Sequence, residues 1–256
     1  MKRKRIQWST VIFIVVLLLI VGFIASFIMA FYGNPITSVI ATAKIRHYVE
    51  DTYSDMDLEV PKANYNFKFV EYVSHVSSKS SQDTRFSVSW SDGKISDSYE
   101  EDVIGRNTTY DRINREFSEK VEGIIEREFP YQTSILFATL GEGVQDYDML
   151  SLDMVLDVKE PPMPAKLVIY IMNDEVSYDF LIARLLELDQ LMGKYEIPID
   201  QYTVVIEEPL IEGEEKPKPN GNSIHLLDFP AKNLKSADLL SVIKEHQRIW
   251  EEQHEK

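Results

Sequence analysis

Cysteine is missing from all 256 positions of the sequence. Without a thiol, the chain has no disulfide bond, no thiol nucleophile and no thiolate ligand for a metal ion. Processing as a lipoprotein also requires a cysteine, so that route to a membrane is excluded. The place of the chain in the cell must be inferred from other features.

Metal-binding motifs are missing as well. The five histidines show no His-x-His, His-Glu-x-x-His or His-x₃-His spacing, so they predict no zinc site. They are His47, His75, His225, His246 and His254. His47 falls on the predicted apolar stripe of a helix, which favours a core or interface position over a ligand role. His246 and His254 are too far apart along a helix to share one ion.

The patterns of nucleophilic and phosphate-binding sites are equally sparse. No Gly-x-Ser-x-Gly occurs, and the densest glycine cluster, Gly141-Glu142-Gly143, lacks the lysine of a phosphate loop. Ser-x-x-Lys occurs twice, at Ser91 and Lys94 across a predicted turn and at Ser241 and Lys244 within a predicted helix. Two such matches are close to chance in a serine-rich sequence. The sequence therefore predicts no catalytic residue, no cofactor site and no metal site.

Basic residues are the minority, 27 against 42 acidic ones, and the formal net charge is −15. Because the first 32 residues carry +4 and no acid, the rest of the chain carries −19. Such an excess of negative charge disfavours nucleic-acid binding and peripheral docking on anionic lipid. Asp97 and Glu100–Asp102 form an acidic cluster, but it lacks the spacing of a calcium loop and is typical of a solvated charge run.

One long hydrophobic run follows the basic residues Lys2–Arg5. Its core, Val11–Phe31, would span about 31 Å as a helix, against about 30 Å of bilayer hydrocarbon. Its length and its bulky C-terminal end favour a retained anchor over a cleaved signal peptide. The basic tip is expected to stay in the cytoplasm, which places residues 33–256 outside the cell. A cysteine-free chain in that position fits a Gram-positive-type envelope better than a secretory-pathway lumen.

A juxtamembrane domain of one helix and three strands is predicted over residues 33–102. Asn34-Pro35 predicts the start of the helix, which continues to about Tyr53. Alternating Tyr65, Phe67 and Phe69 predict a half-buried strand to about Val73, and a serine-rich loop follows at 74–81. The stripe of this helix expected to be buried comprises Ile36, Val39, Ile40, Ala43 and His47.

The dipeptide Asp92-Gly93 predicts a two-residue β-hairpin turn. In that register Ser91 faces Lys94 and Trp90 faces Ile95. The large apolar residues then share one face of the sheet, so Trp90 is expected to be buried there.

Residues 103–256 are predicted to form a second α+β domain. Helices are expected from Asn107 to before Pro130, over 177–192, and from Ser236. Strands are expected at 134–140, 150–158, 165–172, 202–206 and 223–227, and a Glu-, Lys- and Pro-rich flexible loop at 211–222. A helix followed by three strands occurs twice in this reading, which leaves a divergent duplication open. The predicted class is α+β, with a single N-terminal transmembrane helix (residues 1–32 with its basic tip) followed by two small helix-plus-antiparallel-sheet domains.

Several of these features occur together in one family. The basic-tipped anchor is followed by Gly33-Asn34-Pro35-Ile36, a helix with Tyr48 and Tyr53 at its end, the aromatic segment Tyr65–Phe69, and a hairpin leading to Tyr99. In this order the chain resembles the YfjL-like membrane-anchored proteins of Gram-positive bacteria, most closely over residues 1–100. The resemblance implies location and architecture, and it brings no catalytic residue with it.

The sequence favours a non-enzymatic, membrane-anchored extracytoplasmic module that binds or regulates a protein or peptide of the cell envelope. Exposed sheet edges could accept a strand from such a partner. Aromatic residues such as Tyr72, Tyr131 and Tyr147 could form a recognition surface. One alternative is a structural or assembly component that pairs through Gly22 and Ser26 in the anchor. A hydrolase whose catalytic carboxylates cannot be singled out is the other.

Overall fold

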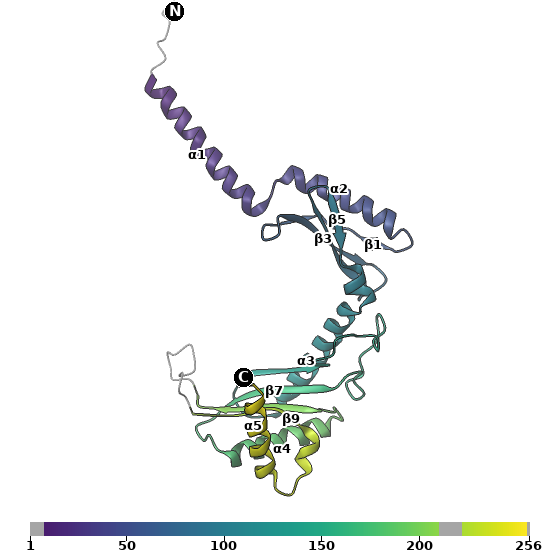
Figure 1. Ribbon diagram of the computed structural model, residues 1–256, viewed down its shortest axis with the longest axis vertical. Helices are drawn as coiled ribbons and strands as arrows, with labels where there is room; N and C mark the ends of the chain where they lie inside the picture. The colour runs from purple at the N-terminus through teal and green to yellow at the C-terminus, as the bar shows by residue number, and fades with distance from the viewer. Residues whose placement is uncertain (1–7, 210–221, 255–256) are drawn as a thin grey trace, which may run out of the picture. The chain divides into compact units, whose positions relative to one another are not determined.

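The computed structural model of the chain describes residues 8–209 and 222–254 (Figure 1). Its helices and its two sheets confirm the predicted α+β class. The chain divides into two compact units, Met1–Thr108 and Thr109–Lys256, and each unit contains one sheet. The loop predicted at 211–222 lies outside the described residues, except for its last position.

The first helix, α1, runs from Trp8 to Tyr32. Within the described part of the chain, one helical stretch is long and apolar enough to cross a membrane; it begins near the N-terminus, and its most apolar window is unburied. Apolar side chains surround the whole circumference of α1, so the helix has no polar face to turn toward water.

Helix α2 (Pro35–Thr52) begins as its sequence predicts. The Asn34 side chain accepts a hydrogen bond from the Ile36 N–H at 2.8 Å, and Pro35 takes the first helical position, where no N–H is needed.

The predicted buried face of α2 is wrong. Small residues decide which side packs, because they allow the helix backbone to approach the strands closely, and the Ser38 hydroxyl donates to the Ala63 carbonyl at 2.6 Å. His47 therefore lies on the exposed side, 3.3 Å from Asp51, and is not a core residue. The buried residues of α2 are Ser38, Ala41, Ile45 and Val49, whereas Ile36, Val39 and Ile40 are exposed.

The sheet of the first unit is antiparallel throughout. Its strands have the order β1-β3-β4-β5, and β2 also pairs with β3. The strands are β1 (Leu58–Glu59), β2 (Asn64–Asn66), β3 (Glu71–Ser78), β4 (Arg85–Ser91) and β5 (Lys94–Asp97), and a short π-helix, η1 (Glu100–Ile104), follows.

The hairpin between β4 and β5 has the predicted register, with Trp90 opposite Ile95 and Ser91 opposite Lys94. Asp92 and Gly93 both have positive φ, 48° and 81°, as a type I′ turn requires. Trp90, however, is only half-buried, so the prediction of a buried tryptophan is wrong.

The aromatic strand predicted from Tyr65 to Val73 is in fact a hairpin. Strand β2 ends at Asn66, residues 67–70 form a turn, and β3 begins at Glu71. Strand β3 then continues to Ser78 through most of the segment predicted as a serine-rich loop. Phe67 and Phe69 are therefore exposed at a turn instead of alternating into a core.

The second unit contains a four-stranded sheet of order β6-β7-β8-β9. Strands β7 and β8 are parallel, a pairing that the sequence pattern did not reveal, and the other pairs are antiparallel. Among the described residues, only β6 and β7 lie between α3 and α4, so the expected helix-then-three-strands order is absent from this unit. The elements are α3 (Asn107–Glu128), β6 (Thr133–Leu140), β7 (Ala165–Met172), α4 (Tyr178–Lys194), β8 (Gln201–Glu207), β9 (Ser223–Pro230), the 3₁₀-helix η2 (Ala231–Lys235) and α5 (Leu239–His254).

The strand predicted at Leu150–Val158 is wrong. This segment makes successive turns, closed by the Met154 N–H on Ser151 at 3.2 Å and the Glu160 N–H on Asp157 at 3.2 Å. Leu150 is nevertheless buried, and Met154, Leu156 and Val158 pack against the core. The apolar residues thus alternate because one side of this irregular segment packs on the core, not because the segment is a strand.

The core of the second unit lies between one face of the sheet and the helices. Phe117 of α3, Leu185 of α4 and Ile243 of α5 are fully buried beside Leu167 and Val204 of the central strands. Figure 1 shows α4 and α5 beside this sheet. The opposite face of β6 and β7 carries the side chains described next.

A candidate binding groove in the second unit

A groove of about 580 Å³ runs over the outer face of β6 and β7. Its walls are the first half of α3 and the segment 141–147, and its floor includes Phe137, Thr139 and Val168. Phe137 is 42 % exposed, so an apolar ring in mid-strand faces the open space. This combination of an apolar floor with polar walls is typical of a ligand site.

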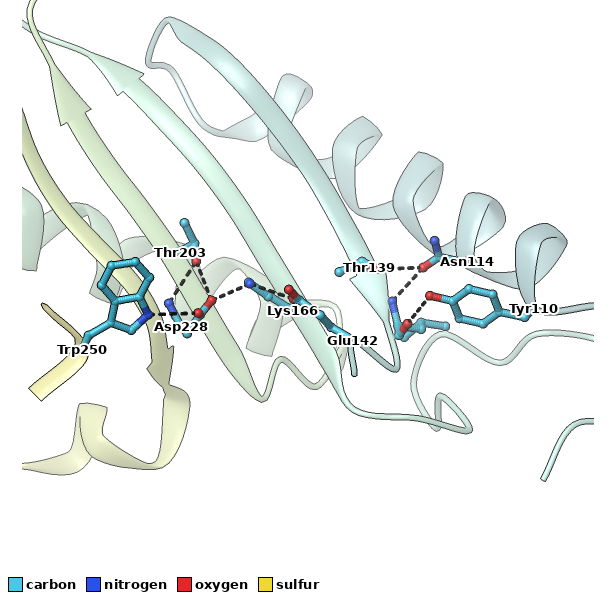
Figure 2. A network of polar contacts seen from close by, with 9 residues as sticks. Tyr110, Asn114, Thr139, Glu142, Lys166, Thr203, Asp228 and Trp250 are labelled. Atoms are coloured by element: carbon cyan, nitrogen blue, oxygen red, sulfur yellow. Dashed lines mark hydrogen bonds and ion pairs between the residues drawn. The ribbon is translucent and has the colours of Figure 1, made fainter. Parts of the chain in front are cut away.

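One end of the groove is formed by a largely buried cation, Lys166 (Figure 2). The Lys166 ammonium lies 2.5 Å from Asp228 and 2.7 Å from Glu142, and its side chain is only 12 % exposed. Asp228 also accepts hydrogen bonds from the Thr203 hydroxyl at 3.3 Å and from the Trp250 indole at 3.3 Å. The network therefore joins β7, β8, β9 and α5.

A β-bulge aims the Asp228 carboxylate into this network. The register of β8 with β9 shifts between Tyr202 and Val204, and Asp228 has a φ of 51°. The Asp228 N–H donates to the Thr203 hydroxyl at 3.0 Å, which satisfies the backbone group that the bulge removes from the ladder.

The charges of the network stabilise one another. Burial alone would lower the pKa of Lys166, but the hydrogen bonds and charges of Asp228 and Glu142 outweigh it and raise that pKa. Burial likewise acts to raise the pKa of Asp228, yet the bonds from Lys166 and Trp250 lower it. Lys166 therefore stays protonated and Asp228 stays ionised near neutral pH. Neither is poised to exchange a proton with a substrate.

Aromatic rings form one wall of the groove. Tyr110 of α3 and Tyr147 stack with their centroids 4.2 Å apart and their planes 9° from parallel. The Tyr110 hydroxyl donates to the Leu140 carbonyl at 2.9 Å, which fixes the ring at the end of β6 (Figure 2). Burial, followed by the nearby Tyr110, raises the pKa of Tyr147, so its hydroxyl is neutral and can donate a hydrogen bond.

Helix side chains bond backbone groups on both outer strands of the second sheet. On β6, the Leu140 N–H donates to Asn114 at 2.7 Å and the Ala138 N–H donates to Ser118 at 3.0 Å. On β9, the carbonyls of Leu227 and His225 lie 2.7 Å and 2.5 Å from the side chains of His246 and Gln247 in α5. These groups cannot pair with an added strand, so the expectation of exposed edges is wrong at these positions.

The residues singled out from the sequence do not gather in one place. Over residues 8–209 and 222–254, no group of three His, Asp or Glu side chains is arranged to hold a metal ion. In the acidic cluster, Asp97 accepts bonds from the Tyr48 hydroxyl and the Tyr99 N–H, and Asp102 accepts one from Ser98. These local bonds occupy carboxylates that could otherwise bind calcium.

The three tyrosines proposed as a recognition surface have different environments. Tyr72 is buried, and its hydroxyl bonds the backbone of Asn34, so it belongs to the core. Tyr131 packs against Phe129 and beneath the Arg184 guanidinium, 4.3 Å from its ring. Only Tyr147 lines the groove.

Sequence reasoning missed Lys166 and Asp228. A signal was present, because each is a lone charge inside an otherwise apolar strand segment. Such a charge must be paired when its strand is buried. The pairing itself depends on the bulge at Asp228, which leaves no pattern in the sequence.

Comparisons with known proteins match the chain at both ends. The model described as YfjL-like, N-terminal domain, matches residues 8–102, and the model described as YfjL-like C-terminal domain matches residues 116–244. No curated protein and no solved structure matches the chain. The groove lies within the region matched by the C-terminal domain, apart from four residues of α3: Tyr110, Asp111, Asn114 and Arg115.

Proposed function

The chain belongs to the YfjL-like family, and we propose that it is a non-enzymatic, membrane-anchored module that binds a protein or peptide partner in the cell envelope. Helix α1 anchors it, and residues 33–256 lie outside the cytoplasm. The partner occupies the groove over β6 and β7. The positively charged N-terminal tip and the length of α1 support this topology.

The exposed Phe137 ring carries the proposal. Phe137 lies in mid-strand and faces an open groove. A partner side chain that covers the ring removes its apolar surface from water, which favours binding. The neighbouring Tyr110–Tyr147 stack offers a second flat apolar surface. An extended peptide with one or two apolar side chains fits both.

The polar groups around the groove support binding over catalysis. Lys166 and Asp228 satisfy each other, and Asn114 and Ser118 are engaged with the β6 backbone. A catalytic base must be able to change its protonation state, and a nucleophile must be free to attack. The four side chains named above are instead hydrogen-bonded or ion-paired within the protein. Internal satisfaction instead rigidifies the walls, which lowers the cost of ordering them on binding.

Site-specific photocrosslinking in native membranes tests this function. We expect p-benzoylphenylalanine in place of Phe137 to yield one discrete adduct. The matched control is the same group in place of Val155, which is 89 % exposed in the same unit and outside the groove. Adducts that are identical at the two positions, or absent at both, would argue against a partner in the groove.

A further inference from the structure

The turn between β2 and β3 presents bulky apolar side chains to the outside. Residues 67–70, Phe67-Lys68-Phe69-Val70, are here called the aromatic tip. Phe67, Phe69 and Val70 are 58 %, 65 % and 64 % exposed. Three large exposed apolar side chains within four residues, interrupted by one lysine, are unusual for a turn that faces water.

The tip is held in this conformation by local bonds. The Lys68 N–H donates to the Asn66 side chain at 3.2 Å, and the Ser91 hydroxyl donates to the Val70 carbonyl at 3.2 Å. Val70 has a φ of 56°, which a β-branched residue adopts only at a cost. The turn thus keeps its apolar side chains outward in spite of strain at one of them.

The junction between α1 and α2 fixes the tip beside the end of α1. Gly33 has a φ of 71°, and a Cβ there would lie 2.5 Å from Tyr65 in β2. The Asn34 N–H donates to the Tyr72 hydroxyl at 2.8 Å, and that hydroxyl donates back to the Asn34 carbonyl at 3.1 Å. No free linker therefore separates α1 from the hairpin that carries the tip.

Ring contacts show the depth of the tip relative to α1. The Phe67 ring lies 5.5 Å from that of Phe31 in the last turn of α1, and Phe31 lies 5.0 Å from Phe27. In a helix that spans a bilayer, residues at this end occupy the membrane–water interface, where aromatic rings partition favourably. Phe67 is at the same level.

We propose that the aromatic tip inserts into the outer interface of the bilayer that α1 spans, as a second membrane contact of the first unit. This inference rests on the membrane anchoring proposed above. Phe67, Phe69 and Val70 enter the acyl boundary, and the Lys68 ammonium extends to lipid phosphate. The acidic remainder of the chain does not prevent this, because α1 tethers the tip at high effective concentration and apolar burial drives insertion.

Depth-dependent quenching in liposomes tests the inference on the full chain. The sequence has no cysteine, so one cysteine can be introduced at a time and labelled with an environment-sensitive fluorophore. The positions are Phe69 in the tip, Ser80 in the exposed connection at the opposite end of the β3–β4 pair, and Ile20 within α1. The vesicles contain phosphatidylcholine and phosphatidylglycerol, with a quencher attached to lipid at shallow or deep positions.

Insertion predicts that the Phe69 label is blue-shifted and quenched best by the shallow quencher. The Ile20 label is expected to be quenched by the deep one, and the Ser80 label by neither. A quenched Ile20 label with an unquenched Phe69 label would overturn the tip proposal and leave the anchor intact. An unquenched Ile20 label would overturn the anchor itself.

A second variant separates lipid contact from contact with another copy. With the label at Lys68, the double substitution Phe67→Ser and Phe69→Ser is expected to abolish shallow quenching while the far-ultraviolet circular dichroism stays unchanged, because both rings are exposed. Efficient disulfide dimers through Phe69→Cys, without lipid quenching, would identify the tip as a self-association surface and contradict the proposal.

Discussion

At the scale of single residues, Lys166 is a cation that pairs with two carboxylates in the second unit. Replacing it with Met leaves Asp228 and Glu142 facing each other without a cation. We expect Lys166→Met to lower the free energy of unfolding by about 1 kcal/mol, since Asp228 and Glu142 lose a charged donor but are 39 % and 58 % exposed and remain partly hydrated. Denaturant unfolding of the full chain in detergent measures this change.

Lys159→Met is the matched control, because Lys159 pairs with Glu196 at an exposed site. No measurable change is expected there, as solvent and salt screen such pairs. Equal effects of the two substitutions would show that the partly buried Lys166 pairs contribute no more to stability than an exposed pair.

The titration of Asp228 adds a test by pH. Hydrogen bonds from Lys166 and Trp250 lower the pKa of this carboxyl, against the opposing effect of its burial. Its stabilisation is therefore complete above the unfolded value of about 4 and is lost as pH falls through the lower folded value. We expect the stability difference between wild type and Asp228→Asn to be flat from about pH 6 to 9 and to shrink below about pH 4. A difference that changes through neutral pH would contradict the assignment.

Gly33 is a second position where a single atom matters. Gly33→Ala places a methyl group in a left-handed conformation and 2.5 Å from Tyr65. Gly93→Ala is the control, because Gly93 has a similar φ of 81° but open space around it. The strain of positive φ costs roughly 1–3 kcal/mol in both, and only Gly33→Ala adds a clash. Thermal unfolding of the first unit should therefore shift more for Gly33→Ala, and equal shifts would mean that the α1–α2 junction is not closely packed.

At the scale of secondary-structure elements, α3 protects the free edge of β6. Removing Asn114 and Ser118 together, as Asn114→Ala and Ser118→Ala, exposes the N–H groups of Ala138 and Leu140. We expect faster hydrogen exchange at these two amides and concentration-dependent association, because an uncovered edge can pair with another strand. Ser241→Ala, on the exposed side of α5, serves as the control and should change neither. Unchanged exchange at both amides would mean that the two side chains do not cap the edge.

Several elements can be predicted from local chemistry alone. Asn34 and Pro35 start α2 because one caps an N–H and the other needs none. Asp92-Gly93 sets the register of β4 and β5 because few dipeptides adopt positive φ twice. These signals act within a few residues, so no tertiary information is needed.

Other features depend on packing partners that are distant in sequence. Helix α2 has two candidate apolar faces, and the choice of Ser38 and Ala41 depends on the close approach of Ala63. The segment 150–158 alternates like a strand but has no strand beside it. The candidate groove could not be predicted for the same reason. Lys166, Glu142 and Asp228 come from three separate segments, and a bulge in β9 brings Asp228 into place.

At the scale of the whole molecule, charge is distributed unequally along the chain. The first 32 residues carry +4, and the remainder carries −19. The proposed topology, with the basic end in the cytoplasm, rests on the lysines and arginines of that end, because acidic residues contribute little to orientation. The proposed aromatic tip carries one lysine, Lys68, whose ammonium lies 5.5 Å from the centroid of the Phe69 ring, and the acidic Glu71 follows the turn as the first residue of β3.

The topology yields the last prediction. Single cysteines at Ser80 in the first unit and at Glu119 in the second, whose side chain is 69 % exposed, should react with a membrane-impermeant maleimide in intact cells. Cysteine at Lys4 should react only after permeabilisation, because the proposed topology keeps the basic end in the cytoplasm. After permeabilisation, a Lys4→Cys, Glu119→Cys double variant should carry both labels on one full-length chain if the anchor is retained. Labelling of Lys4 in intact cells would invert the topology, and a Glu119 label on a shortened chain would show that the N-terminal segment is cleaved.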